Sequence, residues 1–416
     1  MVRLSRSIGS GGVRSAAARE GSMTARVGGI AAAIAVLCTA AAAEARKHVV
    51  RSGESIRDAI AQARAGDRIE VEPGVYHEGR PGDLNALRIT GDGVELIGKT
   101  RAGRRVVLEY AGGQSFGIWV SPANSAGPGP EADPEKPPCG LDGSTIRGFA
   151  LEGFTVRGFE QHGLHLACVE RFRIEDNVSE GNHVYGLFPV LSRDGILSGN
   201  VVRGSDKDAG IYVGQSDRVV IAGNRAEDNL LGLEVENSRD CSVFGNELTG
   251  NTLGIIVDIL PDKIRLTQER TVVAGNRVHD NNRENTAEPG DIIAVLPPGI
   301  GILLSGADTT RVTLNDVHGN QFAGIAVVSL CLAFVLQGEP GCPADLPVNP
   351  DPDGNRIVGN RVTGNATVPT GTPLDALLGD LVWDGSGTGN CWSRNRFASS
   401  VPPQLPACPK DRDDRD

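Results

Sequence analysis

Three carboxylates, Glu234, Glu236 and Asp258, are the side chains of this sequence with the clearest capacity for chemistry. Glu234 and Glu236 are two residues apart in a short apolar segment, so a strand there would point both to one face. Clustered carboxylates raise one another's pKa and place a proton donor beside an ionised partner, as glycoside hydrolysis requires. Glu236 and Asp258 would also suit Ca²⁺, and a solvated acidic rim without a ligand is the third interpretation.

The sequence repeats a short motif in which a glycine and an aliphatic residue are followed by a variable residue. Glu234 is the variable residue of one copy, and aromatic residues occupy the same position in earlier copies. If the aliphatic residues point inward, the variable residues form one outward column. Aromatic rings in that column would bind sugars by stacking on their apolar faces, or they pack beneath loops and contact no ligand. The predicted column reads Trp119, His165, Phe188, Tyr212, Glu234, Ile256, Leu303 and Ala326.

A uronate substrate would need further groups. β-Elimination or C5-epimerisation requires a base, and a cation or arginine that neutralises the substrate carboxylate. Tyr212, His165, His183 and Arg239 are candidates for these roles, with Arg239 a candidate substrate-binding residue. Asp208, two residues before its glycine, could bind a sugar or a metal, or could belong to a turn with an ion-paired lysine. The column contains no Lys or Arg, which favours hydrolysis over elimination.

These positions belong to a repeat with a period of 22 to 24 residues, which insertions lengthen in its later copies. Each copy begins with an asparagine and has a second asparagine or small polar residue five positions later. Most copies then continue with glycine and an aliphatic residue. Such a period indicates one supersecondary unit stacked many times, with a core made by the stacking. The copies begin at Asn177, Asn200, Asn224, Asn246, Asn276, Asn315 and Asn360.

The repeating unit has the pattern of strands. Segments such as 210–213 and 219–221 are short and β-branched, and the Gly, Asn and Asp residues between them favour sharp corners. About 22 residues suffice for three short strands and three corners, and asparagines at one corner would hydrogen-bond from coil to coil. The leucine pattern of leucine-rich repeats is missing, and frequent Gly and Asn exclude helical repeats.

Residues 48 to 400 resemble the right-handed parallel β-helix proteins of the pectin-lyase-like superfamily, because the repeat follows an entry segment, 54–76, typical of that fold. The chain is most similar to uncharacterised secreted proteins with short parallel β-helix repeats. The resemblance implies an all-β, single-stranded right-handed parallel β-helix, a solenoid with an N-terminal capping helix. The superfamily includes lyases, hydrolases, epimerases, adhesins and a periplasmic copper-site maturation protein, so the fold implies no single activity.

We expect four regions along the chain: a leader over residues 1–45, an N-terminal cap over 46–80, the β-helix over 81–400 and a C-terminal tail over 401–416. The last residues of the tail, 409–416, are charged and expected to be disordered. The cap should contain an amphipathic helix that covers the open end of the core. Ser52 is its expected N-cap. Its expected apolar face consists of Ile56, Ala59, Ile60 and Ala63.

Insertions interrupt the repeat beside the glycine-containing strands. Insertions in repeat proteins map to loops on one face, which is often the binding face. They should therefore wall a groove along the sheet that these strands form. The insertions span residues 121–142, 258–270, 282–298 and 329–353.

Composition and the N-terminal segment indicate the compartment. A net charge of −11 argues against nucleic acid as a partner. Met23 could be the true start, followed by an apolar run over 30–43 and a small-x-small cleavage site, Ala43-Glu44-Ala45, as in a secretory signal. The run is short for a membrane span, so we expect a periplasmic or extracellular protein without a stable membrane span in the mature chain.

Seven cysteines follow the leader, and in an exported protein they favour disulfides. The expected pairs are Cys139–Cys168, Cys331–Cys342 and Cys391–Cys408, which leaves Cys241 as a free core thiol.

The sequence thus predicts an exported protein that binds or acts on a polysaccharide or cell-envelope glycan along one sheet. It does not decide whether the protein is a lyase, a hydrolase, an epimerase or no enzyme. The alternatives are a non-catalytic cell-envelope protein and a periplasmic assembly factor for a metalloenzyme.

Overall fold

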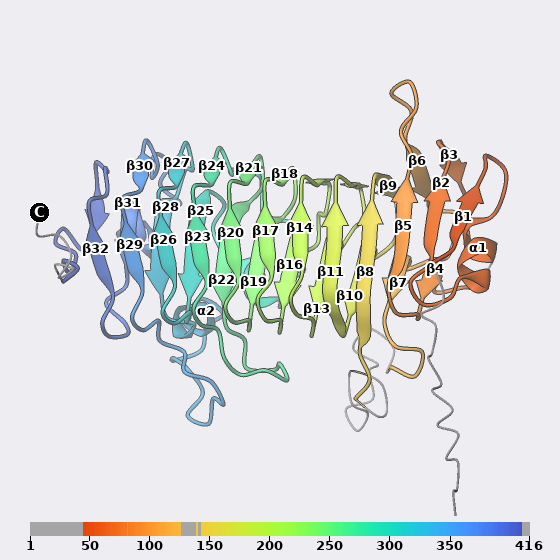
Figure 1. Ribbon diagram of the computed structural model, residues 1–416. Coiled ribbons are helices and arrows are strands. Elements are labelled where there is room, and N and C mark those ends of the chain that lie inside the picture. The colour runs from red at the N-terminus through yellow and green to blue at the C-terminus, as the bar shows by residue number, and fades with distance from the viewer. Residues whose placement is uncertain (1–44, 81, 126–138, 140–142, 410–416) are drawn as a thin grey trace, which may run out of the picture. The chain divides into compact units, whose positions relative to one another are not determined.

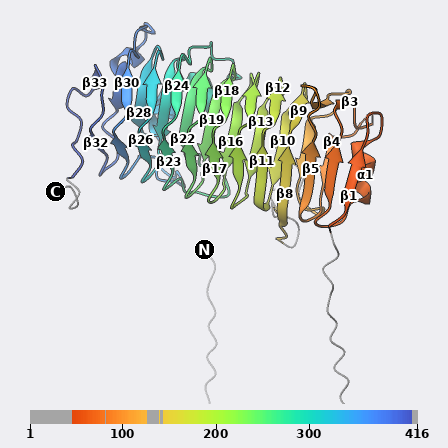
Figure 2. The same cartoon turned by 45° about the horizontal axis from the view of Figure 1, so that its top comes forward.

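The computed structural model describes residues 45–80, 82–125, 139 and 143–409. The predicted leader, apart from Ala45, and the last seven residues of the predicted tail lie outside these described residues. Strands of the described part form three parallel sheets, named A, B and C here, and over residues 68–393 the chain visits them in that order, coil after coil. Figures 1 and 2 show the strands following one another in chain order. The predicted right-handed parallel β-helix is confirmed.

Sheet A consists of β1 (Lys47–Val50), β2 (Arg68–Val71), β5 (Val94–Gly98), β8 (Ile146–Glu152), β11 (Val169–Glu175), β14 (Ile196–Ser198), β17 (Val220–Ala222), β20 (Ser242–Phe244), β23 (Val272–Ala274), β26 (Arg311–Thr313), β29 (Arg356–Val358) and β32 (Cys391–Ser393). Sheet B consists of β3 (Gly74–Tyr76), β6 (Val106–Glu109), β9 (Phe154–Arg157), β12 (Val178–Glu180), β15 (Val201–Arg203), β18 (Arg225–Glu227), β21 (Glu247–Thr249), β24 (Arg277–His279), β27 (Asp316–His318) and β30 (Arg361–Thr363).

Sheet C consists of β4 (Asn85–Ile89), β7 (Phe116–Val120), β10 (His162–Ala167), β13 (Tyr185–Val190), β16 (Ala209–Gly214), β19 (Leu231–Glu236), β22 (Leu253–Asp258), β25 (Ile300–Ser305), β28 (Ala323–Val328), β31 (Gly379–Trp383) and β33 (Ser400–Val401). The helical elements are α1 (Ile56–Gln62), α2 (Cys331–Leu336) and the short 3₁₀ helices η1 (Ile292–Val295) and η2 (Pro373–Leu377).

The main core lies between the three sheets and consists mostly of Val, Ile and Leu. Short strands of sheets A and B, such as β17 and β18, bury only their middle side chain. In contrast, all six residues of β16, β19, β22, β25 and β28 in sheet C are buried. Other parts of the chain must therefore cover the outer face of sheet C, in addition to the core on its inner face.

Asparagine side chains at the corner between sheets A and B form the predicted ladder. Each amide donates to the side-chain oxygen of the next asparagine, over distances of 2.9–3.1 Å. The same oxygen accepts the backbone N–H of the preceding asparagine. The ladder runs through Asn177, Asn200, Asn224, Asn246, Asn276, Asn315, Asn360 and Asn395.

A second ladder at the corner between sheets B and C explains the glycines of the repeat. It runs from Asn229 through Asn251, Asn281 and Asn320 to Asn365. A Cβ atom on Gly232 would lie 2.9 Å from the Asn251 amide nitrogen and 2.7 Å from the Gly254 carbonyl oxygen. Neither leaves room for a side chain, so glycine is required beside the ladder.

The N-terminal cap differs from the prediction in one residue. Helix α1 begins after Ser55, which has an extended backbone and accepts a hydrogen bond from the Asp58 N–H, so Ser55 and not Ser52 is the N-cap. Ser52 lies in the turn that follows β1, too far before the helix to reach its free N–H groups. The predicted apolar face is confirmed, since Ile56 is buried and Ala59, Ile60 and Ala63 pack against the core.

The cysteine predictions are confirmed. Disulfides join Cys139 to Cys168, Cys331 to Cys342 and Cys391 to Cys408, and Cys241 is free and buried. The second of these bonds closes the loop that contains α2. Among the described residues, the two α-helices fall far short of the length and apolarity that crossing a bilayer requires.

We predict that Asn246→Ala strongly destabilises the fold. Its amide donates to the Ile221 carbonyl and to the side chain of Asn276, and its oxygen accepts two hydrogen bonds from Asn224. Removing it leaves these buried groups without partners, which should lower the free energy of unfolding by about 3 kcal/mol or more in urea titrations. Gln404→Ala, at an exposed position near the C-terminus, should change it by less than ~0.5 kcal/mol. Equal losses in the two variants would contradict the ladder's role.

Candidate functional site

The outward column predicted from the repeat is present on sheet C. The strand register pairs Trp119 with His165, and His165 with Phe188. It also pairs Tyr212 with Glu234, and Glu236 with Asp258 on the next coil. The column continues through Ile256, Leu303 and Ala326. At its other end the register adds Arg88 beside Trp119, so the column does contain a cation.

Insertions cover this column over the central and C-terminal coils. Their apolar side chains pack on the outer face of sheet C and make a second hydrophobic core, which includes Ile256, Leu303 and Ala326. The covering side chains from the predicted insertions are Ala287, Ile293, Leu296 and Leu332. Leu374, Leu377 and Leu378, from η2 and the residue after it, complete the cover and lie outside the four predicted insertions. The predicted groove is therefore not open over these coils, because the insertions fold back onto the sheet instead of standing beside it.

The three carboxylates meet beneath this cover. The exposed fractions of Glu234, Glu236 and Asp258 are 4%, 3% and 4%, and one oxygen from each lies within 4.8 Å of the others. Glu236 accepts a hydrogen bond from the Tyr212 hydroxyl at 2.8 Å. Buried oxygens of Glu234 (Oε2) and Asp258 (Oδ1) have no hydrogen-bond partner. Sheet C thus holds unpaired carboxylate oxygens away from water.

Residues 259–268, named the covering segment here, lie over the carboxylates. Lys263 Nζ reaches within 3.6 Å of Glu236 Oε2. The segment is fixed further by Asn237, whose amide donates to the carbonyls of Leu260 and Arg265, and by the ion pair of Arg265 with Asp217. Lys263 is therefore the cation of this site. It is not among the candidates predicted from the sequence, although its position in the insertion directly after Asp258 could have indicated that it lies near the carboxylates.

Burial controls the protonation of the cluster. Desolvation, followed by the charge of neighbouring carboxylates, holds the pKa of Glu234 and that of Asp258 well above their usual ranges. Desolvation also raises the pKa of Glu236, against the opposing effects of Lys263 and Tyr212. The pKa of Asp208, which accepts a 2.6 Å hydrogen bond from the Tyr185 hydroxyl, is raised to about 7 by burial. The group can therefore hold protonated and ionised carboxyls side by side.

The aromatic half of the column is a continuous stack. Phe188 and Tyr212 are parallel within 11° with ring centroids 4.4 Å apart, and His165 stacks on Phe188 at 5.0 Å. The Arg88 guanidinium lies 4.2 Å from the centre of the Trp119 ring. Tyr212 and His165 are buried, whereas Trp119 and Phe188 are only partly buried. Trp119 and Phe188 are thus the rings of this column with surface left for a ligand.

His165 is a weak base in this setting. Burial, together with the charge of Arg88, lowers its pKa to about 3. Its Nδ1 atom lies 3.0 Å from Nδ1 of the stacked His162. The pair is therefore neutral near pH 7 and can share or donate a hydrogen bond there.

Some sequence candidates lie elsewhere. Arg239, the predicted substrate-carboxylate partner, pairs with Asp217 at 3.0 Å and does not join the cluster. The chain turns at Asn237 and carries the next residues toward sheet A. His183 lies at a corner beside Asp206, and Lys207 pairs with Glu288.

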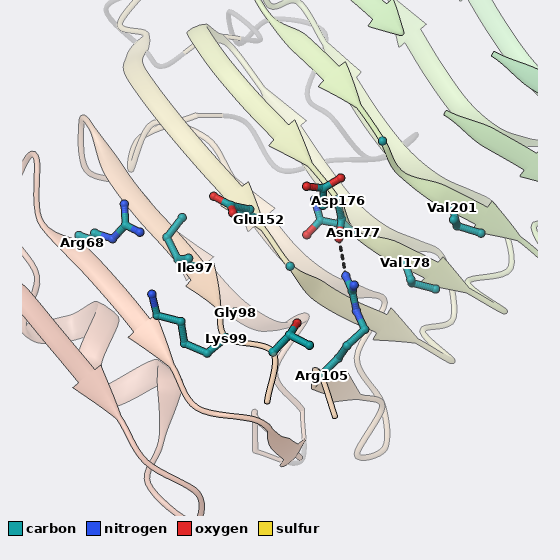
Figure 3. A pocket seen from close by; sticks show the side chains of 13 residues that line it. Arg68, Ile97, Gly98, Lys99, Arg105, Glu152, Asp176, Asn177, Val178 and Val201 are labelled. Carbon is teal, nitrogen blue, oxygen red and sulfur yellow. Dashed lines mark hydrogen bonds between the residues drawn. The ribbon is translucent and has the colours of Figure 1, made fainter. Parts of the chain in front are cut away.

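An open cleft of about 490 Å³ lies on a different part of the molecule from sheet C, next to strands of sheets A and B. Figure 3 shows Arg68, Lys99 and Arg105 on its walls, together with Glu152 and Asp176. Arg68 pairs with Glu95, and Lys99 pairs with Glu70. Arg105 donates to the backbone carbonyl of Asp176. Since Arg68 and Lys99 are already paired with carboxylates, we place the candidate site on sheet C.

Comparison with known proteins supports the fold. The profile of the family described as periplasmic copper-binding protein (NosD) matches residues 142–322. Two similar solved structures are the A-modules of the mannuronan C-5 epimerases AlgE4 and AlgE6 from Azotobacter vinelandii. AlgE4 has a TM-score of 0.51 and AlgE6 one of 0.55, each with 17% identity over 83% of this chain and 83% or 82% of the respective module. The chain is a parallel β-helix protein.

At this identity the two structures show the fold of the β-helix protein and no more. No curated protein sequence matches it. The three disulfides and the similarity to a periplasmic family fit an exported protein, as predicted from the sequence.

We predict that Glu234→Gln stabilises the β-helix protein at neutral to alkaline pH. The folded-state pKa of Glu234 lies above its unfolded value of about 4.3, so the wild type loses stability as pH rises through the folded-state pKa. The melting temperature of the variant should exceed that of the wild type by a few degrees near pH 8 and equal it near pH 4, by calorimetry.

Glu339→Gln, which removes an exposed carboxylate, is the matched control and should behave as wild type at both pH values. A lower melting temperature of Glu234→Gln near pH 8 would show that ionised Glu234 has a stabilising partner, contrary to this account.

Proposed function

We propose that the β-helix protein binds a polysaccharide on sheet C and modifies it by acid–base chemistry at Glu234, Glu236 and Asp258. The observation that carries the proposal is the pair of buried, unpartnered oxygens of Glu234 and Asp258 beside the Tyr212–Glu236 hydrogen bond. Burying carboxylates without partners costs stability, and such arrangements of perturbed carboxyls are typical of functional sites. The similar A-modules are named for action on mannuronan, which supports a glycan as substrate.

The residues divide into two roles. Glu234 and Asp258, with their raised pKa, would be the protonated partners and supply a proton to the substrate. Glu236, held by the Tyr212 hydroxyl and by Lys263, would be the ionised partner that accepts a proton or stabilises positive charge. Trp119 and Phe188 extend the same face toward the N-terminus and would hold the adjoining sugar units.

Access requires the covering segment to move. Its ties to the sheet are the Lys263–Glu236 ion pair, the Asn237 hydrogen bonds and the Arg265–Asp217 pair, all at the rim of the site. An anionic sugar would compete for Lys263, so binding and opening would favour each other. Such lids exclude water during the reaction and strengthen the interactions beneath them.

A Ca²⁺ ion is the second candidate ligand of this site. Glu236 and Asp258 would hold it, with Glu234 close enough to contribute, and carboxylate oxygens are the ligands that Ca²⁺ prefers. Ca²⁺ would satisfy the unpartnered oxygens and would also neutralise a uronate carboxylate.

A role in metalloenzyme assembly has the family match in its favour. Copper(I) carriers prefer sulfur ligands. In the described part of the chain, six cysteines form disulfides and the seventh, Cys241, is buried with its pKa raised to about 12. Since the sheet C carboxylates are hard ligands, we favour the glycan proposal for this site.

The proposal predicts that Glu236→Gln and Asp258→Asn each lower glycan turnover at least ~100-fold without unfolding the protein. The assay is a panel of neutral and acidic polysaccharides, with product size and sugar epimers read by chromatography and NMR, with and without EDTA. Glu339→Gln should keep full activity. Full activity in both site variants would sink the proposal. Activity that is lost in EDTA and restored by Ca²⁺, but not by Zn²⁺, would assign the cluster to Ca²⁺.

Binding can be tested apart from turnover. Trp119→Ala should weaken retention of the protein by its glycan in affinity electrophoresis about tenfold, because it removes a partly exposed ring from the column. Phe244→Ala, an exposed ring on sheet A, should leave retention unchanged. Unaltered retention of Trp119→Ala would mean that the aromatic stack serves packing only.

A further inference from the structure

Two histidines lie on neighbouring coils of sheet B, on a different face from the carboxylates. His279 ends β24 and His318 ends β27, and the strand register pairs them. Their rings are parallel within 15°, with centroids 5.0 Å apart. Both side chains are only partly buried, so water and ions can reach them.

The carboxylate of Asp280 lies beside the two rings. Asp280 has a φ of 54°, and its Oδ2 atom is 2.8 Å from Nδ1 of His279. Gly319, directly after His318, makes room for it, since a Cβ there would lie 2.4 Å from Asp280 Oδ1. One nitrogen from each ring and one Asp280 oxygen all lie within 4.8 Å of one another.

A second carboxylate orients the first ring. Glu247 Oε1 lies 3.4 Å from Nε2 of His279, on the far side of the ring from Asp280. Metal-bound histidines commonly donate their other ring N–H to such a carboxylate, which fixes the ring and its tautomer. In the described part of the chain, no hydrogen bond holds the His318 ring, so it is free to turn toward a shared ion.

We propose that His279, His318 and Asp280 bind one divalent transition-metal ion of borderline softness, with Zn²⁺ as the representative probe. Two imidazoles and one carboxylate match the ligand preference of such ions, and water would complete a four-coordinate site. Two ligands of one tetrahedral Zn²⁺ ion lie roughly 3.3 Å apart. The 2.8 Å separation of His279 and Asp280 needs little change to reach that value.

Comparison with the preceding coil separates what the fold contributes to the proposed metal site from what these residues contribute. Asp228 contacts Gly250 as Asp280 contacts Gly319, so the corner itself positions the aspartate. The column through this position reads Glu227, Thr249, His279, His318 and Thr363, and only two neighbours in it are histidines. The fold supplies the carboxylate, and the sequence adds a histidine pair at one place in this column.

The test is calorimetric titration of the untagged, apo protein with Zn²⁺. The wild type should bind one equivalent, and His279→Ala and His318→Ala should each weaken binding at least ~100-fold. Glu247→Gln should weaken it ~10-fold by releasing the ring. His77→Ala is the matched control, because His77 lies beside a single carboxylate, Glu109, and should leave binding unchanged.

The carboxylate cluster of sheet C could also take up Zn²⁺, so the titration is repeated in the Glu234→Gln/Asp258→Asn background, where the site should persist. Nitrogen couplings in the EPR spectrum of the Cu²⁺ form should report two imidazoles. Absence of Zn²⁺ binding, its loss in the Glu234→Gln/Asp258→Asn background, or its survival in a folded His279→Gln/His318→Gln variant would overturn the proposal.

Discussion

The register between successive coils depends on buried asparagine amides, and every side-chain column depends on that register. Each ladder amide bonds to the coils on either side, so a residue inserted within a strand would shift all later columns and break these bonds. Insertions are tolerated at corners only. The ladder partners are 22 residues apart at Asn224–Asn246 and 45 apart at Asn315–Asn360, yet both bonds have the same geometry. The extra residues leave the coil beside sheet C and return to it.

This constraint explains why sheet C differs from the other two sheets. Insertions that leave beside its strands carry apolar residues, and these bury the outer face of the sheet. From β25 onward the outward column is apolar and suits a sheet covered on both faces. In the central coils the column is acidic, so the same cover places carboxylates where water cannot reach them. Their raised pKa follows from where the insertions lie and needs no special backbone geometry.

Features that repeat could be predicted from the sequence, and features that the insertions create could not. The period fixed the coil, and the aligned positions of Trp119, Tyr212, Glu234 and Asp258 followed from it. Whether a loop stands beside a sheet or lies on it depends on individual contacts, such as those of Lys263 and Asn237. These contacts do not recur from coil to coil, so the repeat does not predict them. The same limit hid the His279–His318 pair, because the insertion over 282–298 separates two residues that the register makes neighbours.

The two polar clusters differ in burial. On sheet B the side chains of His279 and His318 are only partly buried, so ions can reach them from solvent without a change in the fold. On sheet C a single lysine, Lys263, faces Asp208, Glu234, Glu236 and Asp258, so protons or a cation must offset the remaining charge. Moving the covering segment away would return water to these carboxylates and favour their ionisation. Protonation of the cluster and the position of the covering segment are therefore one linked equilibrium, and any chemistry on sheet C must draw on both.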